Sequence, residues 1–426
     1  MLYRSIVCVV AVVCAIAVCW AEDTNSAAST KNSPYLFLWA GDAAHKSSDV
    51  LVVVNADPKS PSYGRTVTTI PVGISGSQPH HTEYEFPADN RLFANSWVAG
   101  RTFIFELSHP QNPRIVTHFD SRAGYSFAHS FVRLPNGNVL ATFQSYGKGY
   151  APGGGLVELD TKGAVIRSAS AVDTTLSKDI IWPYSLAVVP RRDLVVSSST
   201  PMGRAGWAPE VPGSWPSKKI DEQVTSHVQL WRLSSLQLLK TITLPPDGKK
   251  HDQYPAEPRL LPEGTVYVNT FSCGLFRMKG LETANPVAEQ VYSFPGGGSM
   301  HTMCSVPVVA GHYWIQTVGA LPGLVVLDVS DPGKPVEVSR LTLDSQFQMP
   351  HWLAADRKGE RLVLTGDGQD WALIINFDPR NGTLHIDEGF REAGAKSPGI
   401  KLDRQQWQDG RTGPAEVHGA LFGPNE

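Results

Sequence analysis

A recurring strand pattern constrains the fold of this chain more than any other feature. Short apolar runs alternate with a second apolar strand, such as NVLATFQS (138–145) or DLVVSSS (193–199), and turn residues separate the two. Units of about 40 to 50 residues built from such strands are typical of β-propeller blades. The aligned first runs begin at His81, His129, Tyr184, Glu257, His301, His351 and His418.

The remaining sequence also favours β-structure. Sustained helical periodicity is missing after the N-terminal segment, whereas β-branched runs separated by Gly, Pro, Asn and Asp recur throughout. We therefore expect a nearly all-β protein. The turn between the third and fourth strand of a unit often carries a proline, which marks a chain reversal. These turns are Asp57-Pro58, His109-Pro110, Asp331-Pro332 and Asp378-Pro379.

The two ends of the chain are expected to complete one blade together. The N-terminal unit supplies three strands before His80 and lacks a first one, while HGALFGP, from His418, has the missing pattern. Supplied from the C-terminus, this strand would become the inner strand of blade 1 and close the ring. The prediction is an all-β, seven-bladed β-propeller over residues 34–426, closed by a C-terminal strand that completes the N-terminal blade.

The first residues predict export. Residues 1–21 carry Arg4, then an apolar run, then small residues before an acidic pair, which is the layout of a signal peptide. An uncleaved anchor is the alternative. We expect a flexible segment over residues 22–33, a secreted or periplasmic protein, and no stable membrane insertion after cleavage. A net charge of -3 gives no electrostatic case for nucleic acid.

Only two cysteines, Cys273 and Cys304, remain after the predicted leader. Two cysteines do not make a disulfide framework. They can bridge in an oxidising compartment, but the sequence does not place them together. A glycosylation sequon at Asn381 matters only in a eukaryotic host.

Histidine recurs at the start of five of the seven aligned runs, with Tyr184 and Glu257 in the other two. Because inner strands of a propeller converge on its axis, these histidines are expected to form a ring at one mouth of the channel. A single histidine there is more often solvated or hydrogen-bonded. A ring is best explained by a cation such as copper, iron or zinc rather than magnesium or calcium. The predicted ligands are His80, His81, His129, His301, His351 and His418.

Glu257 has several interpretations. It is a candidate ligand, a base, a partner that orients an imidazole, or a structural carboxylate paired with Arg259. Tyr184 is expected to pack. The long segments 41–49, 146–155, 201–224 and 391–415 are expected on the histidine side, as a gate for substrate or as surface decoration.

Several motifs resemble the selenium-binding protein and methanethiol oxidase family. They are ADPKSP, PHHTEYE, GKGYAPGGGLVELD, PAEPRLL and DVSDPGKPVEVS, with a histidine near the C-terminus. The resemblance runs in order from about residue 35 onward and implies a propeller. It also implies a copper site, since oxidase members convert methanethiol, oxygen and water to formaldehyde, hydrogen sulfide and hydrogen peroxide. The family's histidines match His80, His81, His129 and His418.

The chain departs from the family at two points. TEYEFPADN, after the paired histidines, lacks the cysteine of members named for selenium, which argues against selenium binding. His301 and His351 are not usual in the family and enlarge the ring. The chain therefore resembles a divergent, secreted member.

Together these observations predict an exported copper oxidase of a small thiol, with methanethiol and O2 as substrates. Glu257 is the candidate for proton transfer, because oxidation at carbon removes a proton from the methyl group. One alternative is an iron-dependent polyhistidine oxygenase, which Trp207 and Trp215 would suit. The other is a non-catalytic propeller that binds a metal or a protein partner. No particular protein partner is predicted.

Overall fold

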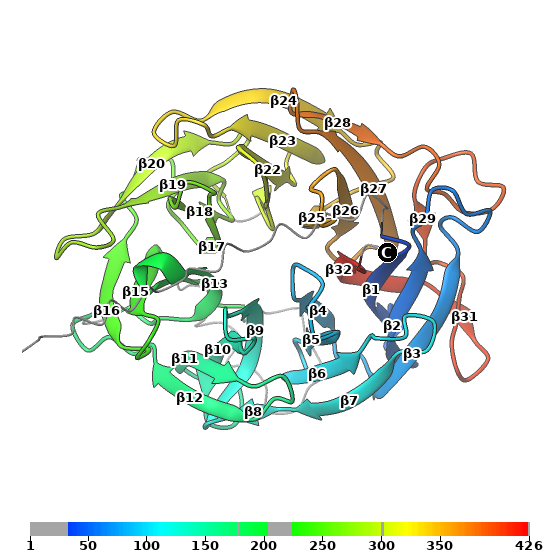
Figure 1. The fold of residues 1–426 in the computed structure, drawn as a ribbon, viewed down its shortest axis with the longest axis horizontal. Coiled ribbons are helices and arrows are strands. Elements are labelled where there is room, and N and C mark those ends of the chain that lie inside the picture. Colours follow the sequence, from blue (N-terminus) through cyan, green and yellow to red (C-terminus); the bar gives the residue numbers. More distant parts are fainter. Residues whose placement is uncertain (1–32, 177–178, 203–223, 300–301, 425–426) are drawn as a thin grey trace, which may run out of the picture.

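A computed structural model describes residues 33–176, 179–202, 224–299 and 302–424. The predicted signal peptide, His301, Trp207 and Trp215 lie outside the described residues. The described chain forms seven antiparallel sheets around one axis (Figure 1), which confirms the predicted seven-bladed β-propeller. Within this part of the chain, no helix is long and apolar enough to cross a membrane.

Each blade has four main strands, ordered from the axis outward. Blade 1 contains β32 (Ala415–Phe422), β1 (Tyr35–Asp42), β2 (Ser48–Asn55) and β3 (Thr66–Ser75). Blade 2 contains β4 (Pro79–Thr82), β5 (Arg91–Ser96), β6 (Arg101–Glu106) and β7 (Arg114–Phe119). Blade 3 contains β9 (Tyr125–Arg133), β10 (Val139–Tyr146), β11 (Gly153–Leu159) and β12 (Val165–Ser170), with β8 (Ser121–Arg122) paired to β9.

The remaining blades follow the same plan. Blade 4 contains β13 (Pro183–Val189), β14 (Leu194–Ser199), β15 (His227–Arg232) and β16 (Leu238–Thr243), with the 3-10 helix η1 (Pro190–Arg192) after β13. Blade 5 contains β17 (Pro255–Leu260), β18 (Val266–Thr270), β19 (Gly274–Lys279) and β20 (Val287–Ser293). Blade 6 contains β21 (Val308–Ala310), β22 (Tyr313–Val318), β23 (Gly323–Asp328) and β24 (Val336–Thr342). Blade 7 contains β25 (Pro350–Ala355), β26 (Arg361–Gly366), β27 (Trp371–Asp378) and β28 (Thr383–Ile386), with β29 (Ile400–Lys401) paired to β27; β30 (Gln405–Gln406) and β31 (Thr412–Gly413) form a separate pair.

The ring closes through β32, as the sequence predicted. This strand pairs with β1, from Leu36 opposite Phe422 to Asp42 opposite Ala415. In Figure 1 the red β32 lies beside the blue β1. Because β32 is the inner strand of a sheet made otherwise from the N-terminus, the two ends of the chain hold each other in one blade.

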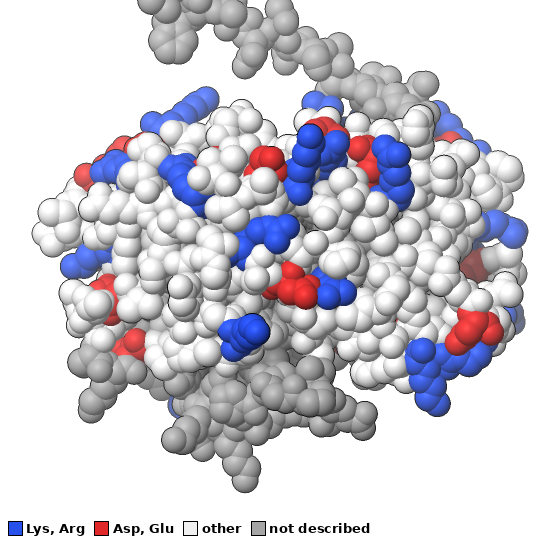
Figure 2. All heavy atoms as spheres, turned by 90° about the horizontal axis from the view of Figure 1, so that it is seen from below, with Lys and Arg blue, Asp and Glu red and all other residues white. Residues whose placement is uncertain are grey.

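Sequence pattern follows burial across each blade. The second and third strands are buried on both faces, so β2 reads DVLVVVN with an almost wholly buried interior. Outer strands face solvent on one side, and β24 accordingly alternates exposed and partly buried residues. On the face shown in Figure 2, basic and acidic residues lie interspersed.

Most inner strands contain a β-bulge near their start, and this positions the site. Between Pro79 opposite Ser96 and Thr82 opposite Ala94, two residues of β4 face one residue of β5. The same two-against-one arrangement occurs in β9, β13, β17 and β32. A bulge re-aims consecutive side chains and relaxes strand alternation. The bulge pairs are His80 and His81, His129 and Ser130, Tyr184 and Ser185, Ala256 and Glu257, and His418 and Gly419.

A disulfide joins Cys273 to Cys304, a pairing that the sequence left open. Cys273 follows β18 in blade 5, and Cys304 precedes β21 in blade 6. The bond therefore links neighbouring blades on the side of the axis where the inner strands begin. It spans 31 residues of sequence and closes a loop that contains β19 and β20.

Candidate metal centre

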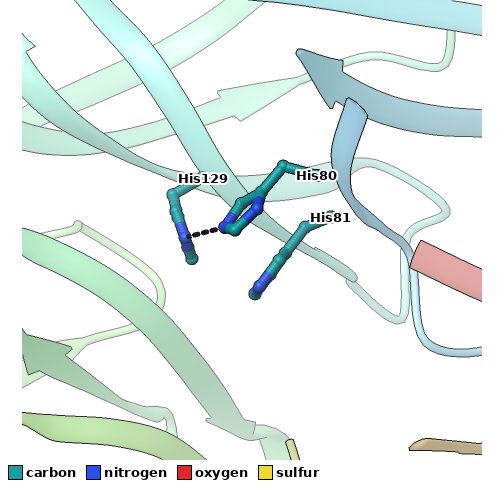
Figure 3. Close-up of side chains that lie close together, drawn as sticks. All are labelled: His80, His81 and His129. Carbon is teal, nitrogen blue, oxygen red and sulfur yellow. Dashed lines mark hydrogen bonds between the residues drawn. The ribbon is translucent and has the colours of Figure 1, made fainter. Parts of the chain in front are cut away.

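Five histidines converge on the axis where the inner strands begin. They come from four strands, β4, β9, β25 and β32, which belong to blades 2, 3, 7 and 1. All are buried, with exposed fractions of 5% or less. Figure 3 shows the side chains of His80, His81 and His129 lying close together. The full group is His80, His81, His129, His351 and His418.

The ring nitrogens lie at distances suited to one small ion. His80 Nε2 is 3.2 Å from His129 Nε2. Among the described residues, two sets of three histidines have one nitrogen each within 4.8 Å of the others, and they share His81. The first set is His80, His81 and His129. The second is His81, His351 and His418.

The structure corrects the sequence alignment by one residue in blades 2 and 5, and by three in blade 6, where Cys304 rather than His301 is equivalent to His129. His80, not His81, is the first bulge residue and thus corresponds to His129, Tyr184 and His418. Glu257 is the second bulge residue of β17, like His81 in β4. The hydrophobic pattern did not reveal this because a bulge adds a residue without changing the apolar runs on either side. Blade 2 therefore contributes two adjacent imidazoles from within one strand.

Backbone carbonyls fix the orientation of two rings. His129 Nδ1 lies 2.8 Å from the carbonyl oxygen of Tyr184, and His418 Nδ1 lies 3.1 Å from that of His80. Since a carbonyl can only accept, each Nδ1 carries the hydrogen and each Nε2 keeps its lone pair. Ligand histidines in metal sites commonly donate their other nitrogen in this way.

Several buried nitrogens in the cluster have no hydrogen-bond partner among the described residues. They are Nδ1 of His80, Nε2 of His81 and His418, and both ring nitrogens of His351. Buried polar atoms are normally satisfied, so a group of unpartnered ring nitrogens indicates a missing binding partner. A transition-metal cation accepts such lone pairs, and imidazole suits copper, iron and zinc. The residues therefore fit a transition-metal ion.

The cluster is neutral at physiological pH. Burial, followed by the charge of neighbouring imidazoles, holds the pKa of His80, His81 and His418 well below the usual range. Burial lowers the pKa of His129 to about 3 and that of His351 to about 4. Neutral imidazoles are the form that binds metals, because protonation removes the lone pair.

Glu257 lies in a second polar cluster across the axis rather than in either histidine set. Its Oε2 accepts hydrogen bonds from Tyr84 Oη at 2.8 Å, Ser185 Oγ at 2.6 Å and Arg259 Nη1 at 2.8 Å. The Arg259 ion pair is one of the alternatives that the sequence allowed. Glu257 Oε1 has no partner among the described residues.

Sequence reasoning missed the residues that connect the two clusters. Ser130 Oγ lies 3.3 Å from His81 Nδ1 and 3.4 Å from Tyr84 Oη. Ser130 is a second bulge residue, and Tyr84 follows the end of β4. A register that included the bulges would have placed Ser130 and Ser185 beside His81 and Glu257 at the axis.

In blades 4 and 5 the first bulge residues are not histidines but Tyr184 and Ala256, and both belong to an apolar cluster. Tyr184, Ala256, Phe271 and Met303 form one buried cluster there, against which Met202, Tyr254 and Met349 pack. The ring of Tyr184 lies 3.9 Å from that of His129, centroid to centroid, and Phe271 stacks at 6.5 Å from His351. The histidines thus occupy one side of the axis and an apolar, sulfur-containing surface occupies the other.

Three of the long segments predicted on the histidine side are described in whole. Tyr150, from 146–155, stacks on Trp182, and Trp97 lies between Tyr150 and His129. Segments 41–49 and 391–415 contact each other through Asp42 and Arg411. Most of 201–224 lies outside the described residues. A gating role for these segments remains a prediction.

The fold and the site together define a class of protein. Its members are seven-bladed propellers in which the inner strands bring buried histidines together at one mouth of the axial channel. A model of the family described as 56kDa selenium binding protein matches residues 22–270, more than half of the chain. The chain belongs to this family, which confirms the resemblance seen in its motifs.

Curated relatives include two proteins named methanethiol oxidase. One, from Hyphomicrobium sp, is 27% identical over 376 residues, covering 84% of this chain and 79% of the relative. The other, from Ruegeria pomeroyi, is 22% identical and covers 82% and 81%. Selenium-binding protein 1 of Arabidopsis thaliana is 27% identical over 128 residues, or 26% of each chain. These similarities support membership of a family that resembles thiol oxidases.

Solved structures support the fold. A hypothetical selenium-binding protein from Sulfolobus tokodaii has a TM-score of 0.67 at 15% identity and covers 91% of this chain and 93% of its own. A periplasmic gluconolactonase from Pseudomonas aeruginosa has a TM-score of 0.59 at 10% identity, covering 90% and 98%. At these identities the likeness extends to the propeller architecture alone.

Proposed function

We propose that the protein is a copper-dependent oxidase of a small thiol, which converts methanethiol, O2 and water to formaldehyde, hydrogen sulfide and hydrogen peroxide. The observation that carries this proposal is the group of buried, neutral histidines with unpartnered ring nitrogens. The two relatives named methanethiol oxidase support the choice of substrate.

The chain's own residues would hold the metal and exclude water from it. His80, His81 and His129 form one candidate ligand set, and His351 and His418 extend it. Copper held by such a set would lower the pKa of a bound thiol and supply one-electron redox chemistry. The carbonyl oxygens of Tyr184 and His80 keep two of the rings oriented before a metal arrives.

The apolar half of the mouth suits a small, soft substrate. The ring of Phe271 lies 6.5 Å from that of His351, Met303 belongs to the same buried cluster as Phe271, and aromatic edges contact sulfur favourably. A methyl thiol would place its carbon against this surface while its sulfur faces the nitrogens. The same arrangement gives no positive group for an anionic substrate among the members of this cluster.

The disulfide supports a location outside the cytosol. Disulfides persist in oxidising compartments, and Cys273 and Cys304 are bonded. Together with the predicted leader in residues 1–21, this leads us to propose that the protein is secreted or periplasmic. Mass spectrometry of the protein from its own compartment tests both the N-terminal cleavage and the bond.

Elemental analysis of protein purified from its own compartment tests the proposed function. We expect stoichiometric copper in the unmodified protein and its loss when His81 and His129 are both changed to Ala. In a matched control, His312 and His385 are both changed to Ala, and the protein should keep the metal. Both side chains are exposed and lie outside the aligned inner-strand runs. Peroxide and formaldehyde formation from methanethiol should follow the copper content.

The outcomes separate the alternatives. Iron in place of copper would favour the polyhistidine oxygenase, which uses the same donor atoms. Absence of any stoichiometric transition metal in the unmodified protein would contradict both enzymes. Copper without peroxide production would keep the metal site and reject methanethiol as the substrate.

A further inference from the structure

A chain of hydrogen-bonding groups connects the histidine cluster to Glu257. It begins at His81 Nδ1, passes Ser130 Oγ at 3.3 Å and Tyr84 Oη at a further 3.4 Å, and ends 2.8 Å away at Glu257 Oε2. The four side chains come from blades 2, 3 and 5, so the path crosses the axis.

The direction of the hydrogen bonds follows from the two ends. The Glu257 carboxylate accepts, so Tyr84 donates to it and can accept in turn from Ser130. Ser130 Oγ is then available to accept from His81 Nδ1, because His129 Nδ1 has a shorter bond to the Tyr184 carbonyl. This arrangement puts the hydrogen of His81 on Nδ1. Its Nε2, which has no partner among the described residues, keeps the lone pair that faces the cluster.

The surroundings hold this path rigidly. Tyr84 stacks on Trp352 with centroids 5.1 Å apart and planes within 9°, and the Arg259 guanidinium lies 4.1 Å from the centre of the Tyr84 ring. Arg259 also pairs with Glu257, which is 1% exposed. The carboxylate is thus balanced by a cation and fixed against a hydroxyl that leads to the histidines. Hydrogen bonds to ionised groups are about twice as strong as neutral ones.

We propose that Glu257 is a positioning residue that acts on His81 through Tyr84 and Ser130. The path fixes the tautomer of His81 and strengthens Nε2 as a metal donor, as outer carboxylates do for ligand histidines in other sites. This inference rests on the proposed metal at the histidine cluster. It gives Glu257 a role different from proton transfer with the substrate.

Tyr84→Phe tests the path with the least disturbance, because it removes one hydroxyl and keeps the ring stack. We expect copper to remain stoichiometric at saturation, with about tenfold weaker affinity. The copper reduction potential should rise, since a weaker nitrogen donor stabilises the oxidised ion less. The spectrum of bound Cu(II) should change with it. Unfolding of the metal-free protein provides the check on folding.

Tyr63→Phe is a matched control elsewhere in the ring. Tyr63 Oη donates to Asp387 at 2.8 Å and accepts from Arg361 at 3.1 Å, which reproduces the hydroxyl, carboxylate and guanidinium away from the histidines. Burial raises the pKa of both Tyr63 and Tyr84 above the usual value for tyrosine. The control should leave copper affinity, potential and spectrum unchanged.

Ser130→Ala provides a second variant in case Tyr84→Phe unfolds. It should weaken copper binding as Tyr84→Phe does. The double variant should lose no more copper affinity than the single variant with the larger loss, because both substitutions break the same path. Equal copper affinity and potential in the unmodified protein, Tyr84→Phe and Ser130→Ala would overturn the path and leave the proposed function standing. An unmodified protein that binds no copper would overturn both.

Discussion

The two halves of the ring differ at one structurally equivalent position. In blades 1, 2, 3 and 7 the first residue of the inner-strand bulge, or the residue before Trp352 in β25, is histidine. In blades 4 and 5 it is Tyr184 and Ala256. In blade 6 the backbone amide of Ser305 donates a hydrogen bond to the Thr317 hydroxyl, just as the amide of Ser130 donates to the Thr142 hydroxyl in blade 3. Cys304, the residue before Ser305, is therefore equivalent to His129.

This difference shows how one scaffold position can serve two purposes. The backbone delivers seven side chains to the same mouth, and residue type alone decides which side can bind a metal. The histidines lie in four consecutive blades, so a metal would sit off the axis and face the apolar half. Such an arrangement would leave one side of the proposed metal without a histidine, which is the side on which a catalytic site would accept its substrate.

Exchange of one residue on each side should give the largest effect. His81→Ala removes the residue shared by both histidine sets, so stoichiometric copper should be lost. Tyr184→Phe changes the residue of blade 4 that is equivalent to His80 and should keep the metal, because its carbonyl still orients His129. Elemental analysis of both variants checks this. Equal copper in the two would remove the distinction between the halves.

The disulfide should stabilise only the apolar half. Replacement of both Cys273 and Cys304 by Ala should lower the free energy of unfolding by about 3 to 4 kcal/mol, the value for a loop of this length in the chain-entropy model. Copper affinity should stay nearly constant, since neither sulfur belongs to a histidine set. Urea unfolding and metal titration measure the two effects. A large loss of affinity would show that the halves are coupled.

A buried carboxylate gives the histidine half a distinct pH response. Burial raises the pKa of Asp49 to about 6 from 3.8, while Asp49 Oδ2 accepts from the Ser77 amide, which precedes β4. Because the pKa is higher in the folded state, the contribution of Asp49 to the free energy of unfolding is full at low pH. It falls as pH rises from the usual value of 3.8 to the folded-state value of about 6. The stability advantage of Asp49→Asn should therefore grow by about 3 kcal/mol between about pH 4 and about pH 6.

Parallel unfolding free energies of Asp49→Asn and the unmodified protein across this pH range would contradict the prediction. Asp160→Asn is a suitable control, because Asp160 caps an exposed turn in blade 3 through backbone hydrogen bonds. Urea unfolding at each pH supplies the measurement.

Met303→Leu should give the smallest effect and probes the apolar surface itself. The two side chains are similar in volume, so the free energy of unfolding should change by less than about 1.5 kcal/mol. Copper affinity should be unchanged, whereas KM for methanethiol should rise with the loss of the thioether. Met278→Leu, in the buried core of blades 4 and 5, is the control. Unchanged KM in Met303→Leu would separate the apolar half from substrate binding.

The sequence predicted the architecture well because blades repeat. The apolar strands, the proline turns and the strand pattern from His418, which the N-terminal unit lacks, were sufficient to predict seven blades and the closure of the ring. The bulges were not visible, since they insert a residue without altering polarity, and they shifted His81 and Glu257 by one position. The disulfide was equally invisible, because nothing in the spacing of Cys273 and Cys304 distinguishes neighbouring blades from distant ones. Tyr84 lies beyond its strand, where periodicity carries no information.

The position of β32 also orders events in time. His418 follows His80 by 338 residues and is therefore synthesised later, yet the centroids of the two rings lie 3.9 Å apart. A ribosome-bound chain without its final strand has neither a closed ring nor the complete set of nitrogens. With the proposed metal, full affinity would therefore require the closing strand, and chains without β32 should bind the ion more weakly.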